Sequence, residues 1–425
     1  MRQLRSKSMA SASHSRNHIF KKERLKNLFN AASVLFYTVF FTVLFSFYLL
    51  YHPRSTVNYT TNINQEYNQT TVFTQPYKND SRSCNLFKGQ WILDERGSLY
   101  TNFSCKTIPY KRNCFLNGRE DRDFLHWRWK PDQCELPRFS PETFLSTLRG
   151  KKMAFIGDSI GRNQMESLLC LLSTVETPKE VYKDAEDLFR TWEFSKHNFT
   201  LMAFWSQFLV TATERVFNGS ATGGFDLQLD KVDQNWSKKL HLMDYVIFSD
   251  AHWFFRQNYL YESNNLIGCV YCQAPNVTDL GPSFAIKSAF QAAFKEINMC
   301  KNCKKIFAFL RTFSPSHFEN GTWNTGGGCN RTRPIVREEV VGRDSDWEFK
   351  NIQVEQIEMA RKIGEYKGNR FEILDITEIM VIRPDGHPGL YWGNPWMKGY
   401  SDCIHWCLPG PIDTWNELLL EMIKR

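Results

Sequence analysis

The segment from Ala31 to Tyr51 is 21 residues long and contains no charged side chain. As a helix it would measure about 31 Å, enough to cross a hydrocarbon core of roughly 30 Å. A secretory signal peptide usually has a shorter apolar region that ends in small residues, whereas this segment ends in bulky residues at positions 48–51. We therefore predict a single transmembrane signal anchor over residues 31–51.

The basic residues of the chain are concentrated before this anchor. The 425 residues include 53 Lys and Arg and 45 Asp and Glu, and residues 1–52 hold eight of the bases but only one of the acids. Cytoplasmic loops retain Lys and Arg, so residues 1–30 are predicted to form a cytosolic tail and the later part to lie across the membrane. That later part has 45 bases against 44 acids and no basic run, so we expect no nucleic-acid partner.

Two features of the part after the anchor favour an oxidising, lumenal location. Its Asn-x-Ser/Thr glycosylation sequons are Asn58, Asn68, Asn79, Asn102, Asn198, Asn218, Asn235, Asn276, Asn320 and Asn330. Its cysteines are Cys84, Cys105, Cys114, Cys134, Cys170, Cys269, Cys272, Cys300, Cys303, Cys329, Cys403 and Cys407. No sequon and no cysteine precedes the anchor, and the even cysteine count suits disulfides.

Composition divides the part after the anchor into three regions. Residues 52–83 are polar, carry three of the sequons and are typical of a glycosylated stem; residues 84–137 are cysteine-rich; residues 138–425 form the main domain. In the main domain, strand-like runs at 152–156, 245–249, 305–310 and 371–376 alternate with helix-like patterns at 160–172, 283–297, 347–366 and 414–423. This alternation predicts an α/β fold with a mostly parallel sheet covered by helices on both faces.

Two Cys-x-x-Cys pairs, at residues 269–272 and 300–303, have the spacing of a four-thiolate zinc site. The oxidising compartment and the even cysteine total favour disulfides instead, so we predict no metal. Connectivity cannot be read from spacing. For Cys170, in the helical pattern at 160–172, we expect a partner in the segment 84–134.

The residues from Lys152 to Ser159 predict a strand, a tight turn and the start of a helix. Such a turn places Ser159 at the carboxyl edge of a parallel sheet, beside backbone amides that can stabilise an oxyanion. The tripeptide Gly157-Asp158-Ser159 is also compatible with an ordinary turn and helix cap, and by itself it favours that interpretation.

A second motif, Asp402-x-x-His405, lies shortly before the last predicted helix. An Asp three residues before a His can accept a hydrogen bond from one ring nitrogen and leave the other to face a serine. A single His is more often a hydrogen-bonded structural group. The combination of Ser159 after the first strand with this motif is what resembles the SGNH (GDSL-like) esterase superfamily.

The resemblance extends to a family within that superfamily. Residues 155–164 (FIGDSIGRNQ) and 402–410 (DCIHWCLPG) are similar to the paired motifs of the plant trichome-birefringence-like (TBL) polysaccharide O-acetyltransferases, which carry a PC-esterase domain. Further similar blocks occur in order at 87–91, 127–131, 311–318, 326–332 and 383–388. The resemblance covers residues 84–425. It implies a three-layer SGNH-hydrolase-like catalytic domain over 138–425, a disulfide-stapled N-terminal segment, and a single-pass type II protein of the Golgi membrane with a lumenal catalytic domain.

The same resemblance implies a catalytic site. Ser159 becomes the nucleophile, His405 the general base and Asp402 its orienting partner, while Asp158 holds the turn. The serine would accept acetyl from a donor, acetyl-CoA or a relayed acetyl carrier, and pass it to a sugar hydroxyl without a bound cofactor. The amide of Ser159 would be one oxyanion donor. A multi-span membrane partner is one candidate supplier of acetyl groups.

One block departs from the family pattern. The family often has Asn-(Thr/Ser)-Gly-His-Trp, but residues 249–253 are SDAHW, so Ser249 replaces an Asn that relatives use as an oxyanion donor. A serine hydroxyl is a shorter donor, and the Asp250 carboxylate would repel an oxyanion, so the assignment of Ser249 is doubtful. The candidate substrate contacts are Arg162, Asn163, His252, Trp127 and Trp129.

The expected acceptor is a plant cell-wall polysaccharide. The Ser249 block and residues 268–272 are more similar to family members that act on xyloglucan than to those that act on xylan, with mannan and pectin as further alternatives. An acetylesterase would use the same triad with water as the acceptor, but an anchor of the Golgi type argues against it. A noncatalytic polysaccharide-binding protein would have no need of an intact triad.

Overall fold

The computed structural model describes residues 84–395 and 397–425. The predicted tail, anchor and stem all precede residue 84, so they lie outside the described residues together with the first three sequons. Within the described part, no helix combines the length and the apolar character that crossing a bilayer requires.

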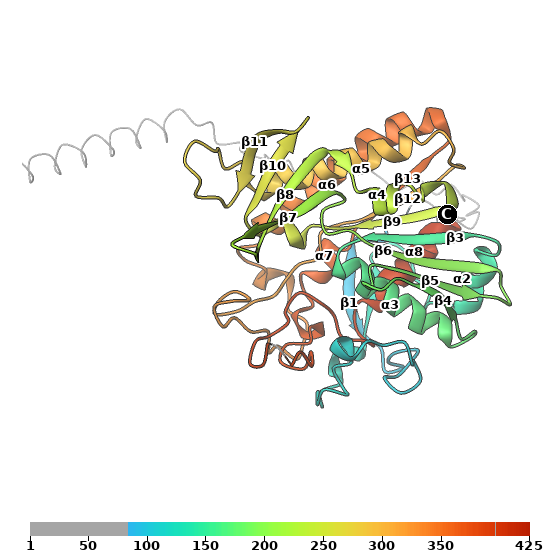
Figure 1. Cartoon of the computed structure of the whole chain (residues 1–425). Helices are drawn as coiled ribbons and strands as arrows, with labels where there is room; N and C mark the ends of the chain where they lie inside the picture. The colour runs from blue at the N-terminus through green and yellow to red at the C-terminus, as the bar shows by residue number, and fades with distance from the viewer. Residues whose placement is uncertain (1–83, 396) are drawn as a thin grey trace, which may run out of the picture. The chain divides into compact units, whose positions relative to one another are not determined.

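A seven-stranded sheet of order β13-β12-β9-β3-β6-β5-β4 forms the centre of the described chain (Figure 1). The first five strands in this order are parallel, and β5 and β4 are added antiparallel at one edge. The strands are β3 Lys152–Gly157, β4 Lys179–Lys183, β5 Phe189–Phe194, β6 Phe199–Trp205, β9 Tyr245–Ser249, β12 Phe307–Arg311 and β13 Arg370–Leu374. The sheet is therefore mixed but mostly parallel, as the alternation of patterns predicts.

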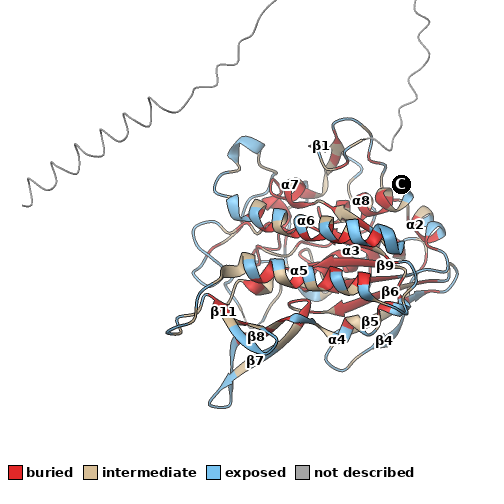
Figure 2. Ribbon diagram, turned by 90° about the horizontal axis from the view of Figure 1, so that it is seen from above, coloured by how far each residue is buried: buried red, intermediate tan, exposed pale blue. Residues whose placement is uncertain are grey.

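Helices cover both faces of this sheet, and α5 and α6 each show a buried side and an exposed side (Figure 2). Successive side chains of a strand point to opposite faces. On β3, Met153 and Phe155 belong to the apolar cluster that includes α3 and α8, whereas Ala154 and Ile156 belong to the cluster that includes α5 and α6. The helices are α2 Pro141–Thr147, α3 Ser159–Ser173, α4 Gln234–Ser237, α5 Gly281–Met299, α6 Asp344–Gly364, α7 Thr377–Met380 and α8 Asp413–Lys424.

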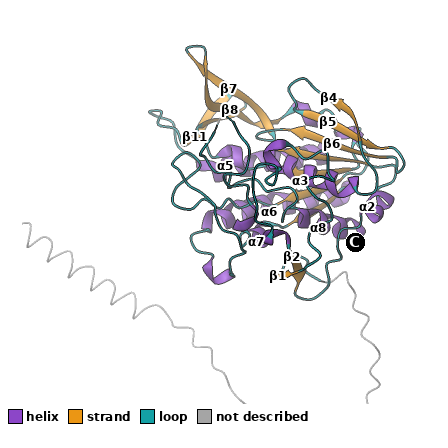
Figure 3. Ribbon diagram, turned by 90° about the horizontal axis from the view of Figure 1, so that it is seen from below, coloured by secondary structure: helices purple, strands orange, loops and turns teal. Residues whose placement is uncertain are grey.

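A second sheet of order β11-β10-β8-β7 extends from the molecule beyond the central sheet (Figure 3). Its strands are β7 Val210–Phe217, β8 Ser220–Val232, β10 Asn258–Glu262 and β11 Asn265–Val270. β8 and β10 pair in parallel, and the outer strands pair antiparallel with them. The sequence did not predict this sheet, because much of β7 and β8 is exposed and carries no continuous apolar run.

The cysteine-rich segment contains an antiparallel hairpin of β1 Gly89–Leu93 and β2 Trp127–Pro131. Trp91 and Trp129 are cross-strand partners whose rings pack edge to face at 5.8 Å. Trp129 is fully buried, and its indole nitrogen donates to the carbonyl of Leu86 at 2.9 Å. The predicted substrate contact by Trp129 is therefore wrong, because this side chain belongs to the core.

All twelve cysteines are paired in disulfides, which are Cys84–Cys134, Cys105–Cys170, Cys114–Cys407, Cys269–Cys272, Cys300–Cys303 and Cys329–Cys403. Cys170 bonds to the cysteine-rich segment, as expected. The two cysteines of each Cys-x-x-Cys pair form a disulfide with each other, which leaves no thiolate to ligate zinc. No cluster of three or more metal-binding side chains occurs within residues 84–395 and 397–425.

Asp413, the first residue of α8, carries a partly buried carboxyl group. Its Oδ1 accepts hydrogen bonds from the hydroxyls of Tyr100, at 2.8 Å, and Ser167, at 2.6 Å. Burial raises the pKa of Asp413 to about 7, although these hydrogen bonds act in the opposite direction. Between the ordinary pKa and the raised one, the folded state binds a proton that the unfolded state has lost, so stability falls as pH rises through this range.

Asp413→Asn should therefore raise the melting temperature of the full chain at pH 8 by about 2 °C or more, and change it less at pH 4. The amide keeps the oxygen that accepts from Tyr100 and Ser167 but cannot ionise. Thermal unfolding of both proteins across this pH range measures the difference. An equal shift at both pH values would show that Asp413 does not carry this pH dependence.

Candidate active site

The turn between β3 and α3 requires glycine at residue 157. Gly157 has a φ of +140°, and a Cβ there would lie 1.9 Å from the carbonyl oxygen of Ser249 on β9. The turn places Ser159 at the carboxyl end of β3 as the first residue of α3. Ligands of parallel α/β sheets bind at this edge, and the N-terminus of a helix favours negative charge.

Asp158 is the N-cap of α3 and holds the turn. Its Oδ1 accepts hydrogen bonds from the amides of Ile160, at 2.9 Å, and Gly161, at 3.4 Å, while its Oδ2 accepts from the amides of Ala251 and His252 at 3.3 Å. Burial raises the pKa of Asp158, but the contacts with His252 and the charge of Arg311 outweigh it and lower the pKa to about 2. Asp158 is thus an ionised link between α3 and the loop after β9.

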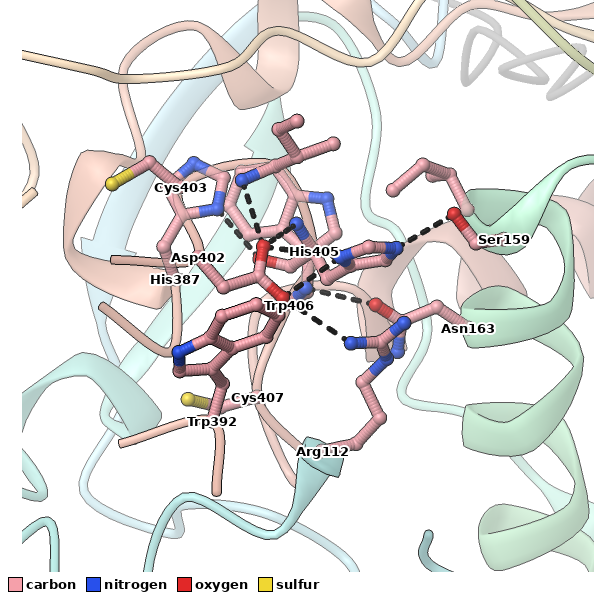
Figure 4. Close-up of polar contacts among 12 residues, drawn as sticks. Arg112, Ser159, Asn163, His387, Trp392, Asp402, Cys403, His405, Trp406 and Cys407 are labelled. Carbon is pink, nitrogen blue, oxygen red and sulfur yellow. Dashed lines mark hydrogen bonds and ion pairs between the residues drawn. The ribbon is translucent and has the colours of Figure 1, made fainter. Parts of the chain in front are cut away.

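The structure brings Ser159, His405 and Asp402 into one hydrogen-bonded array (Figure 4). The distance from Ser159 Oγ to His405 Nε2 is 2.7 Å, and the distance from His405 Nδ1 to Asp402 Oδ2 is 2.8 Å. The backbone amide of His405 also donates to Asp402 Oδ1 at 3.0 Å. With Nδ1–H donating to the carboxylate, Nε2 is left as the acceptor for the serine proton.

The segment that carries Asp402 and His405 is fixed on several sides. The amide of Asp402 donates to the carbonyl of Gly389 at 2.9 Å, and the Gly389 amide donates back at 3.0 Å. Cys329–Cys403 and Cys114–Cys407 anchor the chain on either side of His405. His387 Nδ1 donates to the carbonyl of His405 at 2.6 Å. These contacts fix the backbone around His405, so the position of its ring does not depend on side-chain hydrogen bonds alone.

Arg112, from the cysteine-rich segment, reaches this array and was not predicted from the sequence. Its side chain is buried, and Nη1 lies 3.3 Å from Asp402 Oδ2. Its carbonyl accepts a hydrogen bond from the amide of Leu408 at 2.9 Å, and Cys114–Cys407 fixes the same contact covalently. The two ion-paired residues are 290 positions apart, so proximity to Cys114 is the only sequence signal that points to Arg112.

Charges near the array set the protonation of its two titrating members. Burial would raise the pKa of Asp402, but His405, by charge and hydrogen bonds, and the Arg112 guanidinium hold it well below its usual range. Burial lowers the pKa of His405, Arg112 lowers it further, and Asp402 opposes both. At neutral pH, Asp402 is therefore ionised and His405 is neutral, which is the state that can accept a proton from Ser159.

Two known protein families match consecutive parts of the chain. The family described as "GDSL/SGNH-like Acyl-Esterase family found in Pmr5 and Cas1p" matches residues 136–422. The chain belongs to this acyl-esterase family. A second family, described as "PMR5 N terminal Domain", matches residues 82–135, which include Arg112.

Several relatives of this esterase-family chain are similar over most of their length. It is 53% identical to xyloglucan O-acetyltransferase 4 of Populus trichocarpa over 407 residues, 95% of both chains. It is 53% identical to xyloglucan O-acetyltransferase 2 of Arabidopsis thaliana over 344 residues, 80% of this chain and 83% of the relative. It is 43% identical to protein trichome birefringence-like 19 of Arabidopsis thaliana, over 81% of both chains.

Two residues predicted to contact ligands in this acyl-esterase domain are engaged inside the protein instead. Asn163 is fully buried, and its Oδ1 accepts a hydrogen bond from the amide of Trp406 at 2.8 Å. Ser249 is also fully buried, and its Oγ accepts a hydrogen bond from Arg311. In this structure Asn163 Oδ1 positions the segment that carries His405, while Asn163 Nδ2 is buried without a hydrogen-bond partner. Ser249 joins β9 to β12.

The other predicted contacts in this esterase-family chain differ in accessibility. His252 stacks on Phe313, and its Nε2 donates to the carbonyl of Ser314 at 3.0 Å, which is a structural arrangement. Arg162 donates to the carbonyl of Asp187 at 2.6 Å but stays partly exposed. Trp127 is half-buried in the hairpin. Arg162 and Trp127 therefore keep surface that a ligand could contact.

Proposed function

We propose that this chain is a xyloglucan O-acetyltransferase that works through an acetyl-serine at Ser159. The observation that carries the proposal is the array of Ser159, His405 and Asp402 in a chain 53% identical to proteins named xyloglucan O-acetyltransferase. This arrangement of nucleophile, base and buried carboxylate is one that transfers acyl groups.

The first half of the reaction forms the acetyl-enzyme. His405 Nε2 takes the proton of Ser159 as Oγ attacks the acetyl carbonyl of the donor. The resulting oxyanion accepts a hydrogen bond from the amide of Ser159 at the N-terminus of α3, a contact worth roughly 3 kcal/mol of barrier. The bond between the acetyl carbon and the donor then breaks, and the leaving group receives the proton from His405.

The second half transfers acetyl to the glycan. His405 takes the proton of a sugar hydroxyl, and that oxygen attacks the carbonyl of acetyl-Ser159. The bond between the acetyl carbon and Ser159 Oγ breaks, and His405 returns the proton to the serine. The ionised Asp402 stabilises the imidazolium that forms in each half. The donor is acetyl-CoA or a relayed acetyl carrier, and no bound cofactor takes part.

The proposed location is the Golgi membrane. Three features of the sequence support this location: the uncharged segment 31–51, the basic tail before it and the sequons after it. There are ten sequons, and three of them lie in the proposed stem 52–83. The described domain, residues 84–137 and 138–425, would then face the oxidising lumen, where its disulfides persist. A multi-span membrane partner could supply acetyl groups from the cytosolic side.

An acceptor panel tests the proposed function. The full-length chain in detergent is given an acetyl donor with deacetylated xyloglucan, xylan, mannan or pectin oligosaccharides, and the products are analysed by mass spectrometry. We expect acetylated xyloglucan above the other products. Acetylation of another polysaccharide alone would overturn the substrate assignment, and release of acetate without an acetylated glycan would identify an esterase instead.

A further inference from the structure

The loop between Gly389 and Asp402 begins and ends at two residues that are joined by backbone hydrogen bonds, and one of them is the carboxylate residue of the triad. The backbone bridge between these two residues is described above, and Cys329–Cys403 fixes the same point. Three residues after Asp402 the chain reaches His405. The two ends of this loop therefore lie beside His405, and Figure 4 includes Trp392 of the loop in the close-up around Asp402 and His405.

This loop exposes large apolar side chains. Leu390 is 58% exposed, Tyr391 41% and Tyr400 42%. The indole nitrogen of Trp392 donates to the carbonyl of Tyr400 at 2.9 Å, so the loop is braced from within. Apolar surface that stays exposed on a braced loop near an active site is typical of a ligand-binding surface.

Two neighbouring segments add rings to the same region. Tyr110, 59% exposed, lies against the loop, because a Cβ on Gly393 would be 2.6 Å from Tyr110 Cε1. Trp323, 55% exposed, lies on the segment closed by the bridge between Glu319 and Gly328. A Cβ on Gly328 would be 3.6 Å from Ser401 Oγ, so this segment borders the loop as well.

The chemistry of the loop favours an uncharged ligand. Lys398 is the only charged residue between Pro388 and Ser401. An anionic acetyl donor with phosphate groups would be recognised by several Arg or Lys side chains, which this loop does not provide. A sugar ring has an apolar face of C–H groups surrounded by hydroxyls, and aromatic rings with exposed edges and faces bury such a surface well.

We propose that Tyr110, Trp323, Tyr391 and Tyr400 form an aromatic platform that binds the neutral glycan acceptor and holds it beside Ser159. The identity of the acceptor as xyloglucan rests on the proposed function; the platform itself rests on the exposed rings and on the attachment of their loop to Asp402. The platform differs from the predicted contacts, since Trp127 and Trp129 lie on the β1–β2 hairpin.

The test is the double substitution Tyr391→Ala and Tyr400→Ala in the full-length chain, with Tyr366→Ala as a matched control. Tyr366 is 94% exposed but lies after α6, away from the loop in sequence. Binding of deacetylated xyloglucan oligosaccharides is measured by calorimetry, the acceptor KM by acetyl transfer, and the acetylation of Ser159 by hydrolysis of a small acetyl ester.

We expect the double variant to bind the oligosaccharides about tenfold or more weakly and to raise the acceptor KM similarly. Hydrolysis of the small ester should fall by less than acetyl transfer does, and Tyr366→Ala should keep the binding and the acceptor KM of the parent protein. The corresponding Phe variants should retain most of the binding. Unchanged glycan binding, or a raised KM for the donor only, would overturn the platform. A different result would separate the two proposals. If the parent protein transfers no acetyl to xyloglucan, the proposed function fails. If the double variant is then still the only variant that loses glycan binding, the platform stands.

Discussion

Ser159→Ala should lower the rate of acetyl transfer by about 10⁴-fold or more while leaving the fold intact. In the proposed mechanism the hydroxyl is the attacking group, and its Oγ lies 2.7 Å from His405 Nε2, so alanine removes both the nucleophile and the proton that His405 would take. Alanine also has a high helix propensity at the start of α3, and the cap at Asp158 does not depend on the serine side chain. The measurement is acetyl incorporation into xyloglucan oligosaccharides at saturating donor.

A matched control is Ser173→Ala at the other end of the same helix. The Ser173 hydroxyl donates to the carbonyl of Leu169 at 2.6 Å and has no contact with the triad among the described residues. This variant should keep activity near that of the parent protein. Substantial transfer by Ser159→Ala, with acetylated glycan as the product, would contradict the nucleophile assignment.

Arg112→Met should shift the acidic limb of the pH profile of kcat/KM to higher pH and lower the maximal rate by about tenfold. Arg112 lowers the pKa of His405, and it lies 3.3 Å from Asp402. Without this cation the pKa of His405 rises, so a higher pH is needed to keep the base neutral. The measurement is the initial rate of acetyl transfer across a pH series for both proteins.

Arg112→Lys separates the role of the charge from a purely structural role. Lysine keeps a cation near Asp402. The acidic limb of the pH profile of Arg112→Lys should therefore lie closer to that of the parent protein than the acidic limb of Arg112→Met does. Breaking a buried ion pair also costs about 3 kcal/mol of unfolding free energy, so melting temperatures are compared in parallel. Loss of rate in folded Arg112→Met with an unmoved acidic limb would show that Arg112 only supports the fold.

The parts of the fold that the sequence predicts are those with strong local patterns. The runs at 152–156 and 245–249 correspond to β3 and β9, and the helical pattern at 160–172 corresponds to α3, within one residue at each boundary. These strands are buried on both faces, and α3 is buried along most of its length, so their apolar runs are clear. The added strands β4, β5, β7 and β8 have exposed faces and mixed composition, and local pattern does not separate them from loops.

The residues of the candidate site likewise divide into those that a local motif predicts and those that depend on tertiary contacts. Ser159, Asp402 and His405 were predicted because each belongs to a short motif with a chemical reason for its spacing. Arg112 was missed because an ion pair between distant segments depends on how disulfides and backbone contacts bring them together, which no spacing encodes. The residue types at Trp129 and Ser249 likewise do not show that these side chains are buried, because burial is decided by tertiary packing.

The most direct test of the central claim is the mass of the full-length protein after exposure to an acetyl donor without acceptor. We predict that the protein gains one acetyl group, that peptide mapping places it on Ser159, and that adding deacetylated xyloglucan oligosaccharides removes it from the protein and acetylates the glycan. Transfer to the glycan at a normal rate with no acetyl ever found on Ser159, or with acetyl on another residue that turns over, would contradict the account.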